Sequence, residues 1–330
     1  MVNKSTSVND QNILVTGGAG FIGSHFVDLI LELRPKKVVV VDNFFLGNES
    51  NLNLSLRKYS NLLVIRADST DFCAMQSIVK FHEIKYVYNF ATIPLPTSIT
   101  YSNFTIETNI HSVTTLCELA KIGAFEKLVN VSSSEVYGTG VSFPMNELHP
   151  LNPTTPYAAS KASADLIVTS YVNTFGINAF TVRPFNNFGE RQNFKTFSGL
   201  IPTIISKVTK GFPIEIHGDG KQTRDYIYVL DTVKYILELS LNDELIGKTV
   251  NIGSGVETSV ISLVKQILKL MKKENHEIQH TAHRPGDVGR HQSDNQFLLS
   301  VVGSNPPGVT DYNLNKTVKW YQSRFSEEND

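Results

Sequence analysis

The sequence predicts an α/β fold in which a doubly wound parallel sheet is followed by a smaller α/β domain. Short apolar segments alternate with stretches of helical periodicity along the first half of the chain, as in a parallel sheet covered by helices. One segment, Val38–Val41, lacks the alternation of a half-exposed strand, as expected when both faces are buried. A glycine-rich turn, Gly17–Gly23, follows the first apolar segment and opens a helix. These features indicate a Rossmann-type sheet, and 330 residues are enough for a second domain.

The first domain is expected to span residues 1–184 and to bind a dinucleotide. Its strands are predicted from short apolar runs at Ile13–Thr16, Val38–Asp42, Leu62–Ala67, Tyr86–Phe90, Lys127–Ser132 and Ala179–Arg183. Its helices are predicted from their periodicity at Ile22–Leu33, Phe72–Phe81, Ile106–Gly123 and Tyr157–Phe175. Pro35 follows the first of these helices and ends it.

The pattern becomes less regular after Pro184, and residues 185–330 are expected to form mainly a substrate-binding domain. Short strands are predicted at Ile214–Ile216, Tyr226–Tyr228 and Thr249–Ile252, and helices at Leu200–Lys210, Leu230–Leu241 and Ser259–Lys272. Part of residues 226–252 is expected to return to the first domain. The polar residues from Ser323 onward are expected to be frayed. The second domain should lie against the carboxyl ends of the sheet strands, where ligands bind in such folds.

Composition indicates a soluble, cytoplasmic protein. The formal net charge of −1 gives no electrostatic reason to expect nucleic acid or an anionic membrane as partner. No apolar run approaches the roughly 20 residues of a membrane span, and Met1–Gln11 lacks an apolar signal core. Cys73 and Cys117 each stand alone in a predicted helix. We therefore expect buried free thiols, with neither a disulfide nor a metal site.

The glycine-rich turn is a candidate binding site for a cofactor pyrophosphate. Gly17, Gly20 and Gly23 have the spacing G-x-x-G-x-x-G, which lets the chain turn sharply and lets the backbone approach a phosphate at the helix N-terminus. A tight turn without a ligand is the alternative. Asp42 ends the second strand, where its carboxylate can accept hydrogen bonds from ribose hydroxyls and would repel a 2′-phosphate. The sequence thus favours NAD over NADP. Asp68 ends the third strand and can accept from the adenine amino group or cap a turn.

Tyr157 and Lys161 form a candidate catalytic pair, because side chains four residues apart share one face of a helix. A nearby ammonium favours the ionised phenol, so Lys161 is expected to lower the pKa of Tyr157 below its usual value of about 10. A phenolate beside a dinucleotide site can remove a proton from an alcohol while hydride leaves the carbon. The pair therefore indicates alcohol–ketone chemistry on a nicotinamide cofactor.

With these features the chain resembles the extended short-chain dehydrogenase/reductase family, in particular its nucleotide-sugar epimerases and dehydratases. The motifs that carry the resemblance are Thr16–Gly23, Asn89–Ala91, Val131–Gly138, Tyr157–Lys161, Arg183–Asn187, Gly218–Tyr226 and Arg284–Asp287. The resemblance covers nearly the whole chain. One departure is Asn89, where many relatives have histidine. The resemblance also implies a homodimer, formed by the helices at Ile106–Gly123 and Tyr157–Phe175.

The resemblance implies a role for each matching residue. Ser133 would hydrogen-bond the sugar O4 beside Tyr157, and Lys161 would also hold the nicotinamide ribose. The remaining cofactor contacts are expected from Phe21, Ile22, Asn43 and Ala91, in addition to Gly17, Gly20, Gly23, Asp42 and Asp68. The substrate, a nucleotide diphosphate sugar, would be held by Asn186, Leu200, His217, Arg224 and Arg284. For His217, stacking on the nucleobase and a purely structural role are both open.

Glu135 bears on the outcome of the reaction. In this family NAD oxidises the sugar at C4, and the ketone acidifies the hydrogen on C5. Glu135 stands where the dehydratases carry the base that removes this proton, so we expect elimination of the C6 hydroxyl and reduction by the retained NADH. Ser134, however, replaces the aspartic acid of dTDP-glucose 4,6-dehydratases, although GDP-mannose dehydratases and some UDP-N-acetylglucosamine dehydratases have serine there, so the resemblance still allows elimination. A UDP-hexose 4-epimerase, a nucleotide-glucuronate decarboxylase and, remotely, a non-catalytic NAD-binding protein remain alternatives.

Overall fold

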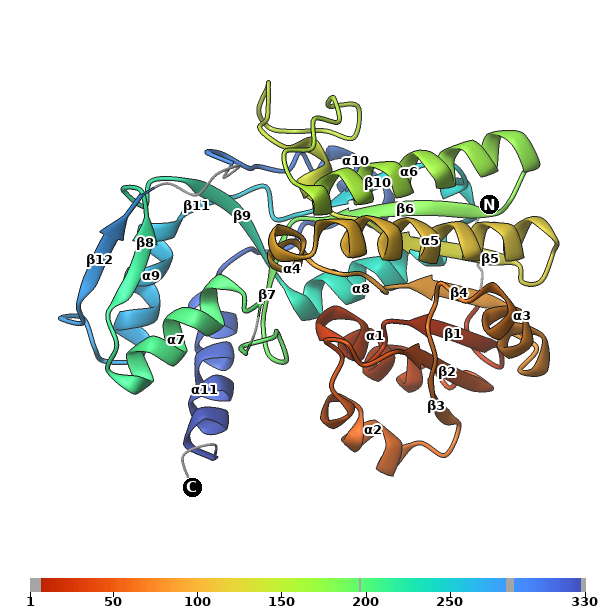
Figure 1. Ribbon diagram of the computed structural model, residues 1–330, viewed down its shortest axis with the longest axis horizontal. Helices are drawn as coiled ribbons and strands as arrows, with labels where there is room; N and C mark the ends of the chain where they lie inside the picture. Colours follow the sequence, from red (N-terminus) through yellow and green to blue (C-terminus); the bar gives the residue numbers. More distant parts are fainter. Residues whose placement is uncertain (1–6, 196, 283–287, 328–330) are drawn as a thin grey trace.

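The computed structural model describes residues 7–195, 197–282 and 288–327, and its centre is a parallel sheet of seven strands (Figure 1). The strand order is β10-β6-β5-β4-β1-β2-β3, which contains the 3-2-1-4-5-6 order of a Rossmann fold. The strands are β1 Asn12–Thr16, β2 Lys37–Asp42, β3 Leu62–Arg66, β4 Tyr86–Asn89, β5 Lys127–Val131, β6 Ala179–Pro184 and β10 Thr249–Ile252. The predicted fold class is confirmed.

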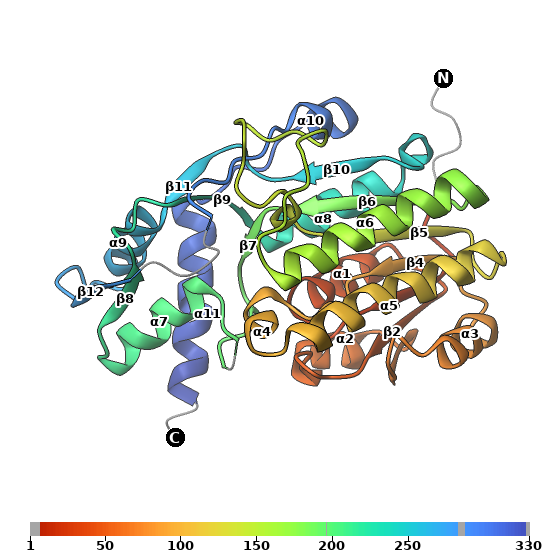
Figure 2. The ribbon, with the colours of Figure 1, turned by 45° about the horizontal axis from the view of Figure 1, so that its top comes forward.

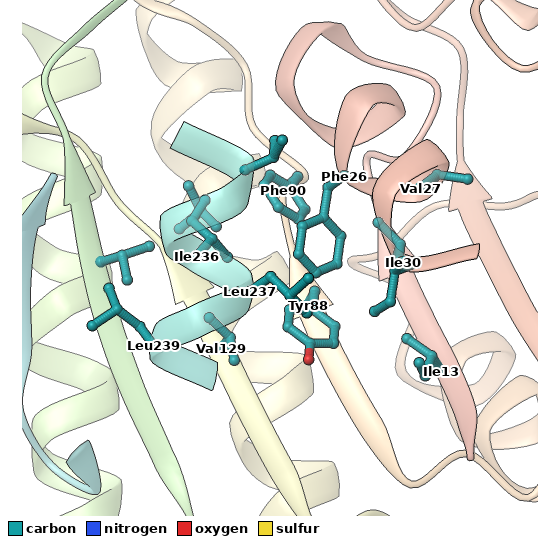
Figure 3. Packing of buried hydrophobic residues seen from close by; sticks show 14 of the residues in the cluster. Ile13, Phe26, Val27, Ile30, Tyr88, Phe90, Val129, Ile236, Leu237 and Leu239 are labelled. Carbon is teal, nitrogen blue, oxygen red and sulfur yellow. The ribbon is translucent and has the colours of Figure 1, made fainter. Parts of the chain in front are cut away.

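Helices cover both faces of this sheet, which explains the uninterrupted apolar strands. Ile13 and Val15 of β1 pack on one face with helices α1, α8 and α10, while Leu14 packs on the other face with α3, α5 and α6. On the first face, Phe26 of α1 contacts Tyr88 and Phe90, with ring centroids 4.5 and 5.1 Å apart (Figure 3). These helices are α1 Phe21–Glu32, α3 Phe72–Phe81, α5 Ser102–Lys121, α6 Pro156–Phe175, α8 Val229–Ser240 and α10 Gln296–Val302.

The remaining elements form a smaller unit at one end of the molecule (Figures 1 and 2). Helices α7, α9 and α11 pack around a separate apolar core that includes Ile204, Leu263 and Tyr321. This unit contains α7 Leu200–Lys210, α9 Val260–Leu270, α11 Asp311–Glu327, β7 Asn186–Phe188, β8 Ile214–His217, β9 Thr223–Tyr228, β11 Glu257–Ser259 and β12 Ile278–Thr281. Short connecting elements are η1 Glu49–Asn51, α2 Asn53–Lys58, α4 Leu95–Thr100, η2 Ser134–Tyr137 and η3 Asp243–Leu245.

Two sequence-based expectations are wrong. Cys73 is exposed, because Met75 and Val79, one helical turn apart, turn the apolar face of α3 inward and leave Cys73 outside; Cys117 is buried as predicted. The expected frayed end is wrong as far as Glu327, where α11 ends, and Phe325 is only 2% exposed; residues 328–330 lie outside the described residues. The frayed end was predicted only from the polar residues of this segment, whereas the buried Phe325 ring anchors the last turn of α11. Within the described ranges, no helix has the length and hydropathy needed to span a membrane.

Candidate active site

A cavity of about 810 Å³ lies at the carboxyl ends of the sheet strands. Residues that end or follow β1, β2, β4, β5 and β6 line one side of it, and residues from β7 to α7 and from α11 line another. The lining includes most of the predicted site residues, namely Gly17, Gly20, Phe21, Ile22, Gly23, Asp42, Asn43, Ala91, Ser133, Glu135, Tyr157, Asn186 and Leu200. Residues far apart in the sequence therefore meet in a single site.

The glycine turn is shaped both by backbone packing and by the open cavity. Gly17 has φ of +66°, and a Cβ there would lie 2.6 Å from the Ala91 nitrogen; a Cβ on Gly23 would lie 2.3 Å from the Gly17 carbonyl oxygen. At Gly20 the only close atom is that same oxygen, at 3.1 Å. Helix α1 has no side-chain cap at its N-terminus, and its first residues, Phe21, Ile22 and Gly23, line the cavity. Such a turn fits the pyrophosphate of NAD.

These glycines allow a test that separates fold from binding. Gly23→Ala is expected to lower the free energy of unfolding by about 1–3 kcal/mol, because the new methyl group overlaps backbone. Gly20→Ala is expected to change stability by less than about 1 kcal/mol and to weaken NAD binding, because its methyl group enters the cavity edge. Urea unfolding and NAD titration measure the two effects. Equal losses of stability in both variants would contradict this assignment.

The carboxylate of Asp42 lies in the cavity wall. It accepts hydrogen bonds from the backbone amides of Ala19, at 3.0 Å, and Phe44, at 2.8 Å. Burial raises the pKa of Asp42, and these two hydrogen bonds oppose the rise. Asp68 is not among the lining residues. Burial favours a higher pKa for Asp68, but hydrogen bonds from Thr70 and Asn43 hold that pKa below its usual value. Asp68 therefore orders the turn beside the cavity.

Ser133, Glu135 and Tyr157 line the cavity together. Ser133 follows β5 and caps η2, where its hydroxyl accepts a hydrogen bond of 3.2 Å from the Glu135 amide. This short turn presents Glu135 to the same space. Thr155 caps α6 and Pro156 occupies its first turn, which places Tyr157 at the start of the helix. Each side chain thus stands at the end of a rigid element.

The expected effect of Lys161 on Tyr157 is wrong for the protein alone. Burial raises the pKa of Tyr157 to about 12; a hydrogen bond to Ser133 opposes this shift, and the nearby Glu135 carboxylate adds to it. Lys161 is 2% exposed, and its ammonium donates a hydrogen bond of 2.6 Å to the Val131 carbonyl oxygen. Burial also lowers the pKa of Lys161 to about 8. The spacing of Tyr157 and Lys161 predicts that they share a helix face, but it does not show that both side chains are buried, and burial dominates both pKa shifts.

A second cavity of about 340 Å³ adjoins the first and shares Asn186 and Leu200 with it. Arg224 and His217 line this smaller cavity. Arg224 donates a hydrogen bond of 2.9 Å to the Thr223 carbonyl oxygen, and a ring nitrogen of His217 lies 2.8 Å from the Thr281 hydroxyl. Arg284, the remaining predicted substrate contact, lies outside the described residues. Among the described residues, no group of three or more potential ligands is arranged to hold a metal ion.

Some site features were not predicted. Asn89 does not line the cavity: its amide joins Thr16 to Asn130 across three buried strands, at 2.7 and 3.1 Å. The cavity also includes Trp320 and Arg324 of the last helix, α11. They could not be found from a local sequence motif, because α11 is far in the sequence from the other site residues and reaches the cavity only through tertiary packing.

Comparisons with known proteins place the chain in a family. A sequence model described as GDP-mannose 4,6 dehydratase matches residues 14–303. The low-salt glycan biosynthesis protein Agl12 of Haloferax volcanii is 33% identical over 94% of this chain and 98% of its own length. The dTDP-glucose 4,6-dehydratase DesIV of Streptomyces venezuelae, solved with NAD and TYD bound, superposes with a TM-score of 0.90, at 29% identity over 96% of this chain and 98% of its own.

A UDP-N-acetylglucosamine 4-epimerase of Methanobrevibacter ruminantium, solved with UDP-N-acetylmuramic acid, is equally similar. Its TM-score is 0.88, at 31% identity over 96% of this chain and 99% of its own. The similar proteins thus include both dehydratases and epimerases, at comparable identity and structural similarity. The glycine turn, Asp42 and Tyr157 line a cavity that fits NAD, the cofactor bound in DesIV, whereas Lys161 is buried behind this lining and is not among the lining residues. The chain belongs to the extended short-chain dehydrogenase/reductase family of nucleotide-sugar dehydratases and epimerases, and it is an NAD-dependent enzyme.

Proposed function

We propose that this enzyme is a nucleotide-sugar dehydratase. It oxidises the hexose transiently at C4, removes the C5 proton, eliminates the C6 hydroxyl as water and reduces the product. The observation that carries the proposal is the position of Glu135, which lines the same cavity as Ser133 and Tyr157. A carboxylate beside the alcohol-oxidising pair has a use in elimination, whereas epimerisation at C4 requires no base at C5.

Ser133, Tyr157 and Lys161 carry out the first step. The hydroxyl of Ser133 positions the sugar O4, and Tyr157 accepts the O4 proton. When bound, NAD supplies the hydride acceptor for the C4 hydrogen. Lys161, whose buried ammonium donates a hydrogen bond to the Val131 carbonyl oxygen, would hold the nicotinamide ribose. The pKa of Tyr157 in the protein alone, about 12, means that ionisation of the phenol depends on groups that arrive with the ligands.

Glu135 performs the second step. The C4 ketone makes the C5 hydrogen acidic because the negative charge left at C5 is delocalised onto the ketone oxygen. The Glu135 carboxylate removes that proton, the electron pair at C5 then expels the C6 hydroxyl, and the protonated Glu135 gives its proton to this hydroxyl, which leaves as water. The hydride taken from C4 then adds to C6 of the unsaturated product, and C5 gains a proton from solvent, which balances the O4 proton that Tyr157 took and releases. Substrate is held through its diphosphate and nucleobase by Asn186, Leu200, Arg224, His217 and Arg284.

A 4-epimerase is the second candidate, and Ser134 is the observation that favours it. Apart from Glu135, the only carboxylate among the described residues that line the large cavity is Asp42, which lies beside the glycine turn. Ser134 is only 2% exposed, and its hydroxyl lies 3.5 Å from His291 Nδ1. The position beside Glu135 therefore offers no carboxylic acid to protonate a leaving hydroxyl. An epimerase needs none.

A panel of UDP-, dTDP-, GDP- and CDP-sugars, with mass spectrometry of the products, distinguishes these reactions. A dehydratase product is lighter than its substrate by one water. A nucleotide glucuronate that loses carbon dioxide would identify a decarboxylase, and unchanged mass with a mixture of C4 epimers would identify an epimerase. Either of the last two results would overturn the proposal.

We also propose that two chains associate through α5 and α6. These helices lie side by side on the surface of the molecule (Figure 2), and Phe104 and Leu166 remain 41% and 60% exposed on them. Burial of such side chains against a second copy would remove apolar surface from water. Light scattering should give the mass of two chains; the mass of one would contradict this arrangement.

A further inference from the structure

The last helix of the chain forms part of the wall of the cofactor cavity. Trp320 and Arg324, one turn apart on α11, both line it, and the Arg324 guanidinium lies 5.3 Å from the centre of the Trp320 ring. The adjacent positions, Tyr321 and Phe325, point into the protein and are almost fully buried. The buried side chains hold α11 in place, and the helix presents the Trp320 indole and the Arg324 guanidinium to the cavity.

The base of this wall is held by the segment that follows β7. The Tyr321 hydroxyl donates a hydrogen bond of 2.6 Å to the Gln192 carbonyl oxygen. The Phe194 ring packs edge-on against Tyr321 and Phe325, with centroids 5.9 and 5.2 Å away. These contacts hold the last two turns of α11 in place, although the polar sequence of this segment predicts a frayed end.

The charges of the cavity lining are distributed unevenly. Its three described cations, Arg191, Lys195 and Arg324, all come from the second half of the chain, and Arg191 pairs with Asp28 of α1 at 2.7 Å. Its two described carboxylates, Asp42 and Glu135, come from the sheet side and have the roles given above. A dinucleotide bound at the N-terminus of α1 would bring a diphosphate into this cavity, whose lining includes these cations. Guanidinium groups bind phosphate oxygens well, and an indole ring provides a flat apolar surface.

We propose that Trp320 and Arg324 close the cofactor site and retain the dinucleotide throughout the reaction. The proposal rests on the function given above, because a hydride removed from the sugar must return to it, and the reduced cofactor must stay bound in between. Arg324 contributes charge toward the pyrophosphate, and Trp320 covers the site against solvent. Substrate can then exchange through the adjoining smaller cavity while the cofactor stays.

Three variants test this assignment by NAD binding without any sugar. Arg324→Ala is expected to raise the dissociation constant for NAD by roughly 10- to 100-fold, the usual effect of losing a charge-assisted hydrogen bond. Trp320→Phe keeps an aromatic ring and should cause a smaller loss. Lys319→Ala is the matched control, since it removes a cation from an exposed position on the same helix. Circular dichroism confirms that each variant is folded.

Trp320 also reports directly, because it is the single tryptophan of the chain. In the unaltered enzyme, NAD should quench its fluorescence and protect it from collisional quenching by acrylamide. Fluorescence and acrylamide quenching that NAD leaves unchanged would overturn the proposal. So would equal NAD affinity in Arg324→Ala and Lys319→Ala. An Arg324→Ala variant with normal NAD affinity but a raised KM for nucleotide sugar would assign the wall to the substrate instead. Because no sugar is needed for binding, failure here is distinguishable from failure of the proposed reaction.

Discussion

Glu135→Gln is expected to abolish loss of water while C4 oxidation continues. The amide keeps the shape of the side chain but cannot accept the C5 proton, and general base catalysis contributes about 10²- to 10⁴-fold to such steps. The variant should therefore form reduced nicotinamide and 4-keto sugar on the enzyme and proceed no further. Absorbance of the reduced nicotinamide measures the first step, and mass spectrometry of the released sugar measures the second.

The control for this variant is Glu126→Gln, which changes a surface carboxylate at the opposite end of β5, where Glu126 pairs with Lys85 at 3.4 Å. It should dehydrate its substrate at the rate of the unaltered enzyme. Normal dehydration by Glu135→Gln would remove Glu135 as the base. Loss of both steps would mean that Glu135 serves the oxidation or holds the substrate.

Tyr157→Phe is expected to block the first step, by about 10²- to 10⁴-fold. Phenylalanine fills the same space but leaves the O4 proton without an acceptor, so no reduced nicotinamide should accumulate with any substrate of the panel. Tyr171→Phe is the matched control, because it removes a phenol hydroxyl from the same helix, where that hydroxyl donates to Glu118. Retained NAD shows that the site is intact. Oxidation at a normal rate in Tyr157→Phe would assign proton removal to another group.

The two variants divide the reaction between neighbouring residues. Tyr157 acts where the oxidation begins, and Glu135 acts only on the ketone. If both predictions hold, one cavity contains both the residues that oxidise the alcohol and the carboxylate that removes the C5 proton.

The parallel sheet could be predicted because each of its first six strands is a local apolar run. Val38–Val41 shows why: residues facing both sides of the sheet are buried, so the strand needs no alternation. The weaker strands β7, β11 and β12 were not predicted. They are three or four residues long, and pairing across the second unit stabilises them more than their own composition does.

Site residues that belong to a local motif could likewise be located from the sequence. Gly20, Ser133 and Tyr157 each follow or open a regular element, so their positions in a parallel fold are nearly determined. Long-range packing decides the rest. Trp320 reaches the cavity only because buried aromatic neighbours fix the last helix, and the raised pKa of Tyr157 depends on burial.

The most direct test of the proposed dehydration uses a nucleotide sugar that carries deuterium at C4. The expected product is lighter by one water and still contains the deuterium, because the hydride removed from C4 returns to the same sugar. A product of unchanged mass, with its C4 configuration inverted, would contradict the dehydration. Loss of water together with loss of the deuterium would contradict hydride return by a retained cofactor.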